Sequence, residues 1–284
     1  MDKLSIWHEK TCNCKPNHLN CLTGAEWMKS QLGVWNFSYD KRDIRDKKIH
    51  PAVFPIQLVE KVIQLFTHKG ELVVDPFVGV GTVLLAAKEL GRNAVGTDIN
   101  SKFIEFAKTR VGESIGGTSQ ILLHDDARDL NQYLEPESVK LVLTSPPYAN
   151  LLNRERKNKS RRADLRQNEQ YGKVEQYSQE PRDLGMMEEK EFEYQFSLIF
   201  KALHKYIKPK GHCVINVTDY WMDNERIPLH INIVNAMTEA GYKLRNTIIW
   251  DRRNLVNNIG IFGYPSNYIT MGTTFEYLLD FIKR

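Results

Sequence analysis

The feature that most constrains the fold is a regular alternation of short apolar runs with amphipathic segments along most of the 284-residue chain. Apolar residues recur at helical spacing in segments such as 56–66 and 191–207, whereas the runs between the helices are short and almost continuously apolar, as buried strands are. Strands that alternate with helices pair in parallel, but no helix separates the last two strands, which permits an antiparallel pair. We therefore predict an α/β fold with a doubly wound, seven-stranded, mostly parallel sheet and an antiparallel last strand. The predicted strands are residues 71–74, 93–97, 120–123, 139–143, 212–218, 244–250 and 274–282.

The texture of the sequence predicts four parts. Residues 1–49 form an N-terminal cap with a cysteine cluster, and residues 50–148 form the first half of the sheet. Residues 149–190 are a polar, basic insert, and residues 191–284 complete the sheet.

Composition excludes several classes of protein. With 42% hydrophobic residues, 26% charged residues and a net charge of +4, the chain is neither disordered nor fibrous. It has no apolar stretch long enough for a membrane span and no signal peptide, so we predict a cytoplasmic protein without a membrane partner. A surplus of +4 is too small to indicate nucleic acid by itself.

A first candidate site follows the first predicted strand, where the sequence reads Asp-Pro-Phe-Val-Gly-Val-Gly-Thr from Asp75. Ligands bind at the carboxyl ends of strands in such sheets, and glycines there let the backbone approach them closely. Asp98, at the end of the next strand, can accept hydrogen bonds from a ribose. The Asp75 carboxylate suits a cationic cofactor, and the third glycine of a dinucleotide fingerprint is missing, which argues against hydride transfer. Asp126 is a candidate acceptor for an adenine amino group or, alternatively, a helix cap.

A second candidate site, Ser145-Pro146-Pro147-Tyr148, follows the fourth predicted strand. The two prolines remove backbone donors and stiffen the chain, so the Ser145 hydroxyl and the Pro146 carbonyl have fixed directions. Such acceptors can hold the hydrogens of an exocyclic amine and free its lone pair for attack on a methyl group. Tyr148 offers an aromatic face to a base that leaves the duplex.

Together the two motifs resemble those of the S-adenosylmethionine-dependent amino-methyltransferases of DNA. The segment His50-Pro-Ala-Val-Phe-Pro-Ile56 resembles the part of that family that covers the methionine end of the cofactor, and residues 274–279 resemble its closing strand. The resemblance implies a Rossmann-like class I methyltransferase fold, S-adenosylmethionine as cofactor, double-stranded DNA as substrate, and catalytic roles for residues 145–148. Its implied cofactor-binding residues are His50, Pro51, Phe54, Asp75, Pro76, Phe77, Gly79, Gly81, Thr82, Asp98 and Asp126.

The resemblance also bears on the methylated base and on the motif order. In this family Ser-Pro-Pro-aromatic is typical of N4-cytosine, whereas Asn-Pro-Pro or Asp-Pro-Pro is typical of N6-adenine, so N4-cytosine is predicted. The catalytic tetrapeptide follows the cofactor motif here, a permuted order relative to many members with this glycine loop.

Other functions stay as alternatives. N6-adenine methylation, guanine-N2 methylation of tRNA, and a silent nucleic-acid-binding module are the competing interpretations; both motifs are intact, which argues against the last. A C5-cytosine enzyme needs a nucleophilic Pro-Cys turn, and Cys213 has no proline before it. A cognate restriction endonuclease is a further partner that the sequence leaves open.

Two segments are predicted to contact DNA. Residues 151–167 contain seven basic residues against two acidic ones and start close after Tyr148, where they would attract phosphates. The polar connection before the last strand could reach base edges. The predicted contacts are Arg154, Arg156, Lys157, Lys159, Arg161, Arg162, Arg252 and Arg253.

Three of the four cysteines lie near the N-terminus. Cys12, Cys14 and Cys21, with His18, could supply four metal ligands, but their spacing is not a standard zinc-finger pattern. We predict reduced cysteines in an N-terminal cap and no metal, and a metal held by these four residues stays an open alternative.

Overall fold

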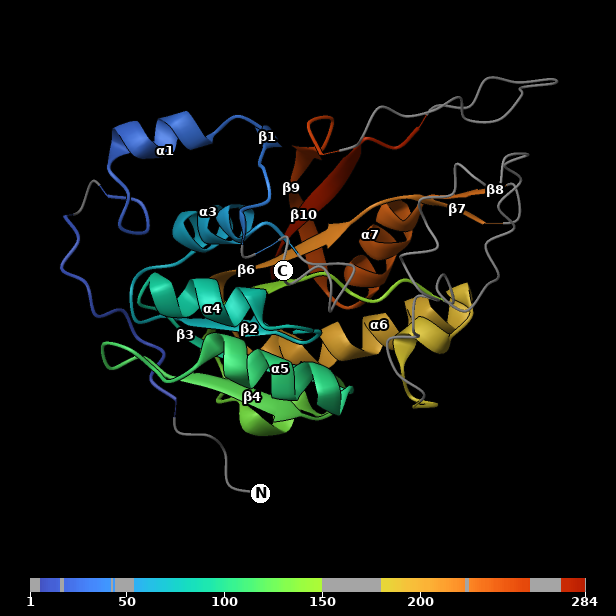
Figure 1. Ribbon diagram of the computed structural model, residues 1–284, viewed down its shortest axis with the longest axis horizontal. Coiled ribbons are helices and arrows are strands. Elements are labelled where there is room, and N and C mark those ends of the chain that lie inside the picture. The colour runs from blue at the N-terminus through green and yellow to red at the C-terminus, as the bar shows by residue number, and fades with distance from the viewer. Residues whose placement is uncertain are drawn as a thin grey trace.

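The computed structural model describes residues 6–15, 18–41, 43, 54–149, 180–222, 225–255 and 272–283. Its centre is an eight-stranded sheet with the order β1-β9-β10-β6-β5-β2-β3-β4 (Figure 1). Strands β2 to β6 pair in parallel with their neighbours, whereas β10 runs antiparallel to both β6 and β9. These strands are β1 (Val34–Asn36), β2 (Leu72–Asp75), β3 (Asn93–Asp98), β4 (Gln120–His124), β5 (Val139–Thr144), β6 (Ile207–Val217), β9 (Tyr242–Asp251) and β10 (Phe275–Lys283). The predicted α/β class and the antiparallel last strand are confirmed.

Helices cover both faces of the sheet (Figure 1). One core lies under α3 (Ile56–Phe66), α4 (Thr82–Glu89) and α5 (Ser101–Val111), and the other lies under α6 (Glu189–Leu203) and α7 (Leu229–Glu239). Side chains alternate between these cores along each strand, since Leu72 and Val74 enter one core and Val73 enters the other. A strand that is buried on both faces must be apolar throughout, which explains the continuous apolar runs.

Several elements begin or end where the local chemistry predicts. Helix α3 has the predicted bounds, and α5 starts after Asn100, whose side chain accepts a hydrogen bond from the Lys102 amide at 3.0 Å. Short 3₁₀ helices and a hairpin complete the described chain: η1 (Leu130–Tyr133), η4 (Leu184–Met186), η5 (His204–Tyr206), and the strands β7 (Tyr220–Met222) and β8 (Glu225–Ile227). Among the described residues, no helix has the length and apolar character that crossing a membrane requires.

Strand β6 begins earlier than the sequence indicates. The stretch from Lys208 to Gly211 is predicted to separate a helix from a strand, but it lies inside β6, and α6 ends at Leu203. The register between β5 and β6 shifts between Val139 and Leu141, and Lys210 has a positive φ of 61°. The irregularity admits Pro209, which lacks the amide hydrogen that a regular central strand requires.

The sheet has one strand more than predicted, and that strand comes from the N-terminal part. β1 pairs in parallel with β9, and Trp35 is buried in the core beneath α3. Before it, α1 (Gly24–Ser30) carries the expected capping box between Thr23 and Glu26. The N-terminal part therefore contributes a strand to the sheet, and the division of the chain into four parts stays a prediction.

The topology brings polar groups to one edge of the sheet. The parallel strands β2, β3, β5 and β6 end at this edge, and the antiparallel strand β10 begins there. Side chains from the beginning of β10 therefore face those from the ends of the other strands, and this edge carries the site described below.

Glycine at position 96, in the middle of β3, is predicted to be essential for close packing of the glycine loop, residues 76–81, which follows β2. A Cβ there would lie 2.6 Å from Val78 Cγ2 and 2.8 Å from Val78 Cβ. We expect Gly96→Ala to lower the free energy of unfolding by about 2 kcal/mol, because the glycine loop must move to admit a methyl group. Gly24→Ala is the control, since no atom lies within 4 Å of its added Cβ. Equal denaturant midpoints for the two variants would contradict the prediction.

Candidate active site

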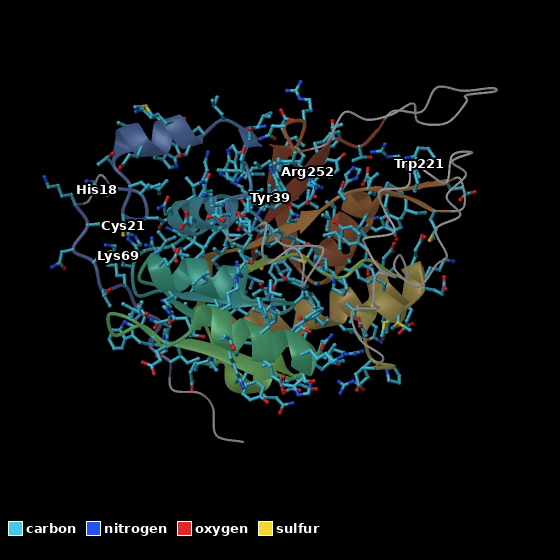
Figure 2. All side chains as sticks on the ribbon, in the orientation of Figure 1. His18, Cys21, Tyr39, Lys69, Trp221 and Arg252 are labelled. Atoms are coloured by element: carbon cyan, nitrogen blue, oxygen red, sulfur yellow. The ribbon has the colours of Figure 1, made fainter. Side chains whose placement is uncertain are left out.

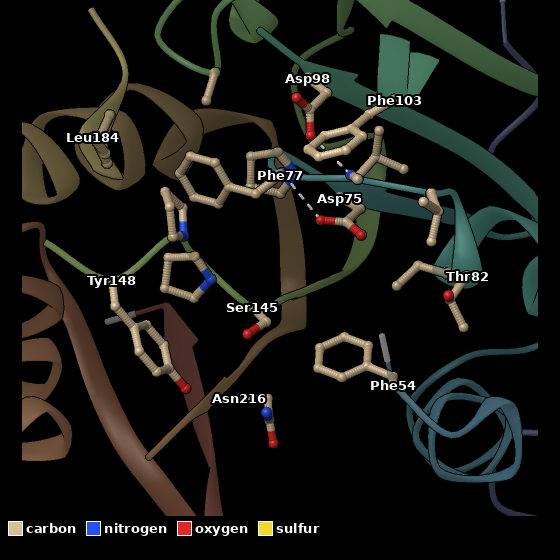
Figure 3. A pocket seen from close by; sticks show the side chains of 18 of the residues that line it. Phe54, Asp75, Phe77, Thr82, Asp98, Phe103, Ser145, Tyr148, Leu184 and Asn216 are labelled. Carbon is tan, nitrogen blue, oxygen red and sulfur yellow. Dashed lines mark hydrogen bonds between the residues drawn. The ribbon is translucent and has the colours of Figure 1, made fainter. Parts of the chain in front are cut away.

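A single cleft of about 410 Å³ lies at the carboxyl ends of the strands, and both sequence motifs line it (Figure 3). The glycine loop after β2 forms one wall, and the Ser-Pro-Pro-Tyr turn after β5 forms the facing wall. Ser145 lies between Tyr148 and Phe54 in this view. The predicted residues in the cleft lining are Phe54, Asp75, Pro76, Phe77, Gly79, Thr82, Asp98, Asp126, Ser145, Pro146, Pro147 and Tyr148.

The glycine loop is held by the end of β3. The Gly79 amide donates to Asp98 Oδ2 at 2.9 Å, and the Thr97 hydroxyl donates to the Pro76 carbonyl at 3.0 Å. Gly81 caps α4 in the left-handed region, with φ 80°, which is why glycine stands there. It does not line the cleft, so its place in the motif is explained by the turn.

Burial raises the pKa values of the two acidic side chains next to this loop, Asp75 and Asp98. It raises the pKa of Asp75 to about 7, although hydrogen bonds from Thr144 and the Phe77 amide favour the ionised form. It raises the pKa of Asp98 to about 6, against hydrogen bonds from the Asn100 and Gly79 amides. The cleft therefore contains two carboxylates that are costly to ionise without a cation, which suits a positively charged ligand.

Asp126 lines the cleft, but its carboxylate already has two basic partners. Arg128 donates to both carboxylate oxygens, at 2.8 and 2.7 Å, and Arg182 Nε lies 3.1 Å from Oδ2. Burial alone would raise the pKa of Asp126, but the hydrogen bonds and charge of Arg128 and the charge of Arg182 hold it below the ordinary value. This geometry favours a structural clamp at Asp126 over the predicted contact with an adenine amino group.

The Ser-Pro-Pro-Tyr turn is fixed at both ends. Before it, the Thr144 hydroxyl donates to Asp75 Oδ1 at 2.6 Å, which ties the turn to the glycine loop. After it, the Tyr148 hydroxyl accepts the Thr218 amide hydrogen at 3.0 Å. The Tyr148 ring stacks on Tyr220, with 5.8 Å between ring centroids. One face of Tyr148 is thus engaged within the protein.

A polar and aromatic wall closes the other side of the cleft, and the sequence interpretation missed most of it. Asn216 Nδ2 donates to Glu276 Oε2 at 2.5 Å, and Arg252 pairs with the same carboxylate while its guanidinium lies over the Trp250 ring. Tyr39 packs edge-on against Trp250, with 6.3 Å between ring centroids. Apart from Tyr39, which follows β1, these residues stand at the ends of β6 and β9 and the start of β10. The rule that places ligands at strand ends could therefore have found Asn216 and Trp250.

Three buried atoms of this wall have no hydrogen-bond partner within the described part of the chain. They are Asn216 Oδ1, Trp250 Nε1 and Arg252 Nε, one acceptor and two donors. Buried polar atoms are nearly always satisfied in folded proteins, so these three indicate a polar ligand or bound water.

The predicted DNA contacts are mostly outside the described residues, as are His50 and Pro51 in the cofactor segment. The contacts concerned are Arg154, Arg156, Lys157, Lys159, Arg161 and Arg162. Arg252 lies in the cleft lining next to Tyr39 (Figure 2) and is committed to Glu276 and Trp250, so its predicted contact with a base edge is not favoured. Arg253 is 77% exposed and pairs with Asp251 on the surface.

Comparison with known proteins adds a family to this geometry. Residues 6–109 match the model of the N6_N4_Mtase family, described as DNA methylase. This chain is 39% identical over 103 residues to type II methyltransferase M.HpaI of Haemophilus parainfluenzae, in an alignment that covers 36% of this chain and 32% of that protein. It is 43% identical over 93 residues to M.HindIII of Haemophilus influenzae, covering 33% and 30% of the two chains. The similarity therefore spans about a third of the length of these curated relatives.

The fold has a known counterpart as well. TrmN from Thermus thermophilus superposes with a TM-score of 0.50 and 16% identity, over 85% of this chain and 53% of that one, which shows a shared Rossmann-like fold. The resemblance to amino-methyltransferases of DNA is confirmed by the family match, and the predicted cofactor, S-adenosylmethionine, is that of the matched family. The matched residues include the glycine loop and Asp98 but end before Ser145, so the permuted motif order stays a prediction.

The raised pKa of Asp75 predicts a pH-dependent cost to stability. Because the folded state binds this proton more tightly than the unfolded state, the cost is full above pH 7 and falls as the pH is lowered toward the ordinary value of 3.8. Asp75→Asn keeps an Oδ1 acceptor for Thr144 and Phe77 and removes the charge. We expect it to raise the free energy of unfolding at pH 8 by a few kcal/mol, roughly.

Denaturant unfolding of both proteins at pH 8 and pH 5 measures this effect. The free energy of unfolding of the variant should exceed that of the native sequence at both pH values. This excess should be less than half as large at pH 5 as at pH 8, a decrease of about 3 kcal/mol at most. A variant that is less stable at pH 8, or a difference that does not change with pH, would show that Asp75 is already ionised without cost.

Proposed function

We propose that this chain transfers a methyl group from S-adenosylmethionine to an exocyclic amino nitrogen of a base in double-stranded DNA, with N4 of cytosine as the acceptor. The single observation that carries the proposal is the shared cleft, in which the glycine loop faces the Ser-Pro-Pro-Tyr turn. Methyl transfer by direct displacement requires the methyl donor and the amine to lie next to each other, so their binding sites must share one cleft. The family match of residues 6–109 supports the same reaction.

The residues of the first wall fit the proposed cofactor. S-adenosylmethionine, when bound, supplies a methyl group on a positively charged sulfonium. Asp98 uses one lone pair on each oxygen for the Gly79 and Asn100 amides and keeps further acceptor capacity for ribose hydroxyls. Asp75 adds negative charge, and the aromatic side chains of Tyr39, Phe54 and Trp250 in the same lining can stabilise a cation through their ring faces.

Apolar residues of the lining suit the adenine of that cofactor. Ile99 follows Asp98 directly, and Phe103, Ala127 and Leu184 also line this part of the cleft. A slot of this kind binds a flat ring by burial, while a few polar groups set its orientation. With Asp126 held by Arg128 and Arg182, we assign adenine binding to these apolar side chains and to neighbouring backbone groups.

The second wall is suited to activate an amine. The Ser145 hydroxyl and the Pro146 carbonyl are acceptors on a turn that Thr144 anchors on one side and Tyr148 on the other. By accepting the amine hydrogens, they would favour a tetrahedral nitrogen whose lone pair is free to attack the methyl carbon. The methylated amine would then lose one proton to solvent, and S-adenosylhomocysteine would be the leaving group.

The unpartnered atoms of Asn216, Trp250 and Arg252 support a polar ligand on this side. A nucleobase has hydrogen-bond donors and acceptors along one edge, and it can satisfy one acceptor and two donors of the protein. Extrusion of the base is needed because its amino group is otherwise paired inside the duplex. Tyr148 lines the cleft and would contribute its aromatic ring to the surface that contacts the base.

The choice of base rests on the Ser-Pro-Pro-Tyr form of the turn. Its serine is typical of N4-cytosine enzymes in the family that the motifs resemble. N6-methyladenine in DNA, or methylated guanine in tRNA, would be the product under the alternative interpretations, and the experiment below separates them.

The basic run at residues 151–167 is proposed to hold the phosphates beside the cleft, and Arg253 offers a further exposed cation. A restriction endonuclease with the same recognition site is a proposed partner, in keeping with the type II methyltransferases to which the chain is similar.

Ser145→Ala tests the activation of the amine. We expect the rate of methyl transfer to DNA to fall on the order of a hundredfold, because one fixed hydrogen-bonding group is lost at the reacting atom. Affinity for S-adenosylmethionine should stay nearly unchanged, since the cofactor wall keeps its contacts. The measurements are tritium transfer from labelled S-adenosylmethionine to plasmid DNA, and calorimetric titration of the cofactor. Ser30→Ala, at the last residue of α1 and outside the cleft lining, is the control.

The products identify the base. Chromatography of the digested nucleosides should show N4-methylcytosine, and a parallel reaction with tRNA should incorporate no label. Labelled N6-methyladenine would overturn the base assignment while leaving the reaction class intact. Label in tRNA alone, or in neither substrate, would contradict the proposed function.

Arg161→Ala with Arg162→Ala tests the phosphate contacts. Each phosphate contact contributes about 0.9 to the slope of the logarithm of the binding constant against the logarithm of salt concentration. The double variant should therefore weaken binding to all DNA sequences and flatten the slope by about 2. Lys201→Ala with Lys205→Ala is the matched control, because Lys201 lies in the last turn of α6 and Lys205 in η5, just before β6 begins and at the opposite end of that strand from the cleft. An unchanged slope would remove the basic run from the interface.

A further inference from the structure

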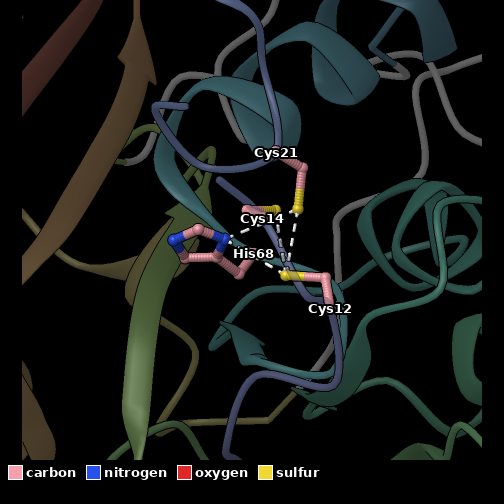
Figure 4. Close-up of side chains that lie close together, drawn as sticks. All are labelled: Cys12, Cys14, Cys21 and His68. Atoms are coloured by element: carbon pink, nitrogen blue, oxygen red, sulfur yellow. Dashed lines mark hydrogen bonds between the residues drawn. The ribbon is translucent and has the colours of Figure 1, made fainter. Parts of the chain in front are cut away.

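Three cysteines and one histidine meet at a single point (Figure 4). Cys12 Sγ lies 3.3 Å from the sulfur atoms of both Cys14 and Cys21, and 3.3 Å from His68 Nδ1. Cys21 Sγ lies 3.5 Å from the same nitrogen. All four candidate ligand atoms lie within 4.8 Å of one another, and none of these residues lines the cleft.

These four residues come from separate parts of the chain. Cys12 and Cys14 precede α1, Cys21 lies in the turn before that helix, and His68 follows the end of α3. In that turn both Asn20 and Cys21 have positive φ, of 46° and 71°, a backbone conformation that L residues seldom adopt. The fold thus keeps an unfavourable local conformation at the residue that brings the third sulfur to the group.

Backbone contacts hold the N-terminal segment against the rest of the molecule at this point. The Thr11 amide donates to the Lys69 carbonyl at 2.9 Å, and Asn20 Nδ2 donates to the Leu65 carbonyl at 2.6 Å. The four side chains therefore converge within a defined surface of the fold. These contacts fix the positions of the four side chains in the folded chain, as a preformed set of metal ligands requires.

The separations between the candidate ligand atoms can be compared with those of a tetrahedral zinc site. Zinc bonds to cysteine sulfur at about 2.3 Å and to histidine nitrogen at about 2.0 Å, so a regular tetrahedron separates two sulfurs by about 3.8 Å and sulfur from nitrogen by about 3.5 Å. The two sulfur–nitrogen separations of 3.3 and 3.5 Å are close to the expected value. The two sulfur–sulfur separations of 3.3 Å are about 0.5 Å shorter than in the tetrahedron, so the sulfurs would move apart slightly around a bound ion. Thiolates with an imidazole are a ligand set that selects zinc over magnesium or calcium. A disulfide would use two of the three cysteines and would leave the third and the imidazole without a role.

We propose that Cys12, Cys14, Cys21 and His68 bind one Zn²⁺ ion in a closed structural site. Four protein ligands complete the tetrahedron and leave no position for water or substrate, so the ion has no catalytic part. The ion fastens the N-terminal segment to the end of α3, which leads directly into β2 and the glycine loop. The proposal is independent of the reaction at the cleft.

The histidine differs from the one that the sequence pointed to. His18 is near the cysteines in the chain, and the spacing with His18 fits no standard zinc pattern; among the described residues, the group contains His68 and not His18. The prediction of no metal rested on that spacing. Figure 2 shows His18 and Cys21 on the same side of the molecule, so His18 is a suitable control for a general effect of removing a nearby imidazole.

Metal analysis of the full chain tests the site. The protein is purified in buffer that contains a thiol reductant but no chelator and no added metal. Its zinc content is then measured by inductively coupled plasma mass spectrometry. We expect one zinc per native chain, the same content in His18→Ala and Cys213→Ala, and at least a fivefold lower content in His68→Ala and in Cys14→Ser. Cys213 is the matched cysteine control because it is buried in β6, away from the group.

A second measurement covers variants that fail to fold. The native chain is stripped of metal and titrated with Co²⁺, which should give the intense visible bands of a tetrahedral cobalt thiolate that disappear when zinc is added. Absence of zinc together with absence of these bands would overturn the proposal. Equal zinc in the native chain and in folded His68→Ala and Cys14→Ser would overturn it too, as would a disulfide among Cys12, Cys14 and Cys21 in the folded, freshly purified chain.

Discussion

The site depends on one buried hydrogen bond, from the Thr144 hydroxyl to the Asp75 carboxylate, at 2.6 Å. Thr144 is the last residue of β5 and Asp75 the last of β2, and the two strands are neighbours in the sheet. The bond therefore connects the beginning of the glycine loop to the beginning of the Ser-Pro-Pro-Tyr turn. It fixes the separation between the loop that we propose binds the cofactor and the turn that we propose binds the amine. A direct displacement tolerates little variation in that separation.

The same hydrogen bond helps to explain why Asp75 is present although a buried carboxylate lowers the stability of the folded state. Asp75 is buried, and Asp98 is close enough to raise its pKa further by charge repulsion. An amide side chain would be easier to bury, yet it could not offer negative charge to a sulfonium. The carboxylate pair thus makes the free cleft less stable and the cleft with a bound cation more favourable, which is the usual conflict between stability and function at an active site.

Much of this arrangement could be predicted from the sequence, because local rules determine it. Buried parallel strands must be apolar on both faces, so β2, β3 and β5 could be recognised from composition alone, and Asn100 marks the start of α5. The motifs stand directly after strands, and parallel strands bring such positions to one edge. The shared cleft of the two motifs follows from topology, without any knowledge of side-chain contacts.

The features that escaped prediction depend on contacts between distant parts of the chain. β1 is a three-residue strand that exists because Trp35 is buried beneath α3 and because β9 offers a free edge, and neither condition is visible locally. Asp126 has a local partner in Arg128, but its second basic partner, Arg182, is far away in sequence, and Arg252 pairs with Glu276 on another strand.

His68 illustrates the limit most clearly. It follows a helix whose apolar pattern gives no reason to look for a ligand. Its place beside the three sulfurs depends on contacts between distant residues, from Thr11 to Lys69 and from Asn20 to Leu65. A search for metal ligands by spacing considers residues that are near in the chain and therefore selects His18. The N-terminal segment supplies both a strand of the sheet and three of the four proposed metal ligands. It is thus tied to the sheet at two places, one at β9 and one at the helix that precedes the glycine loop.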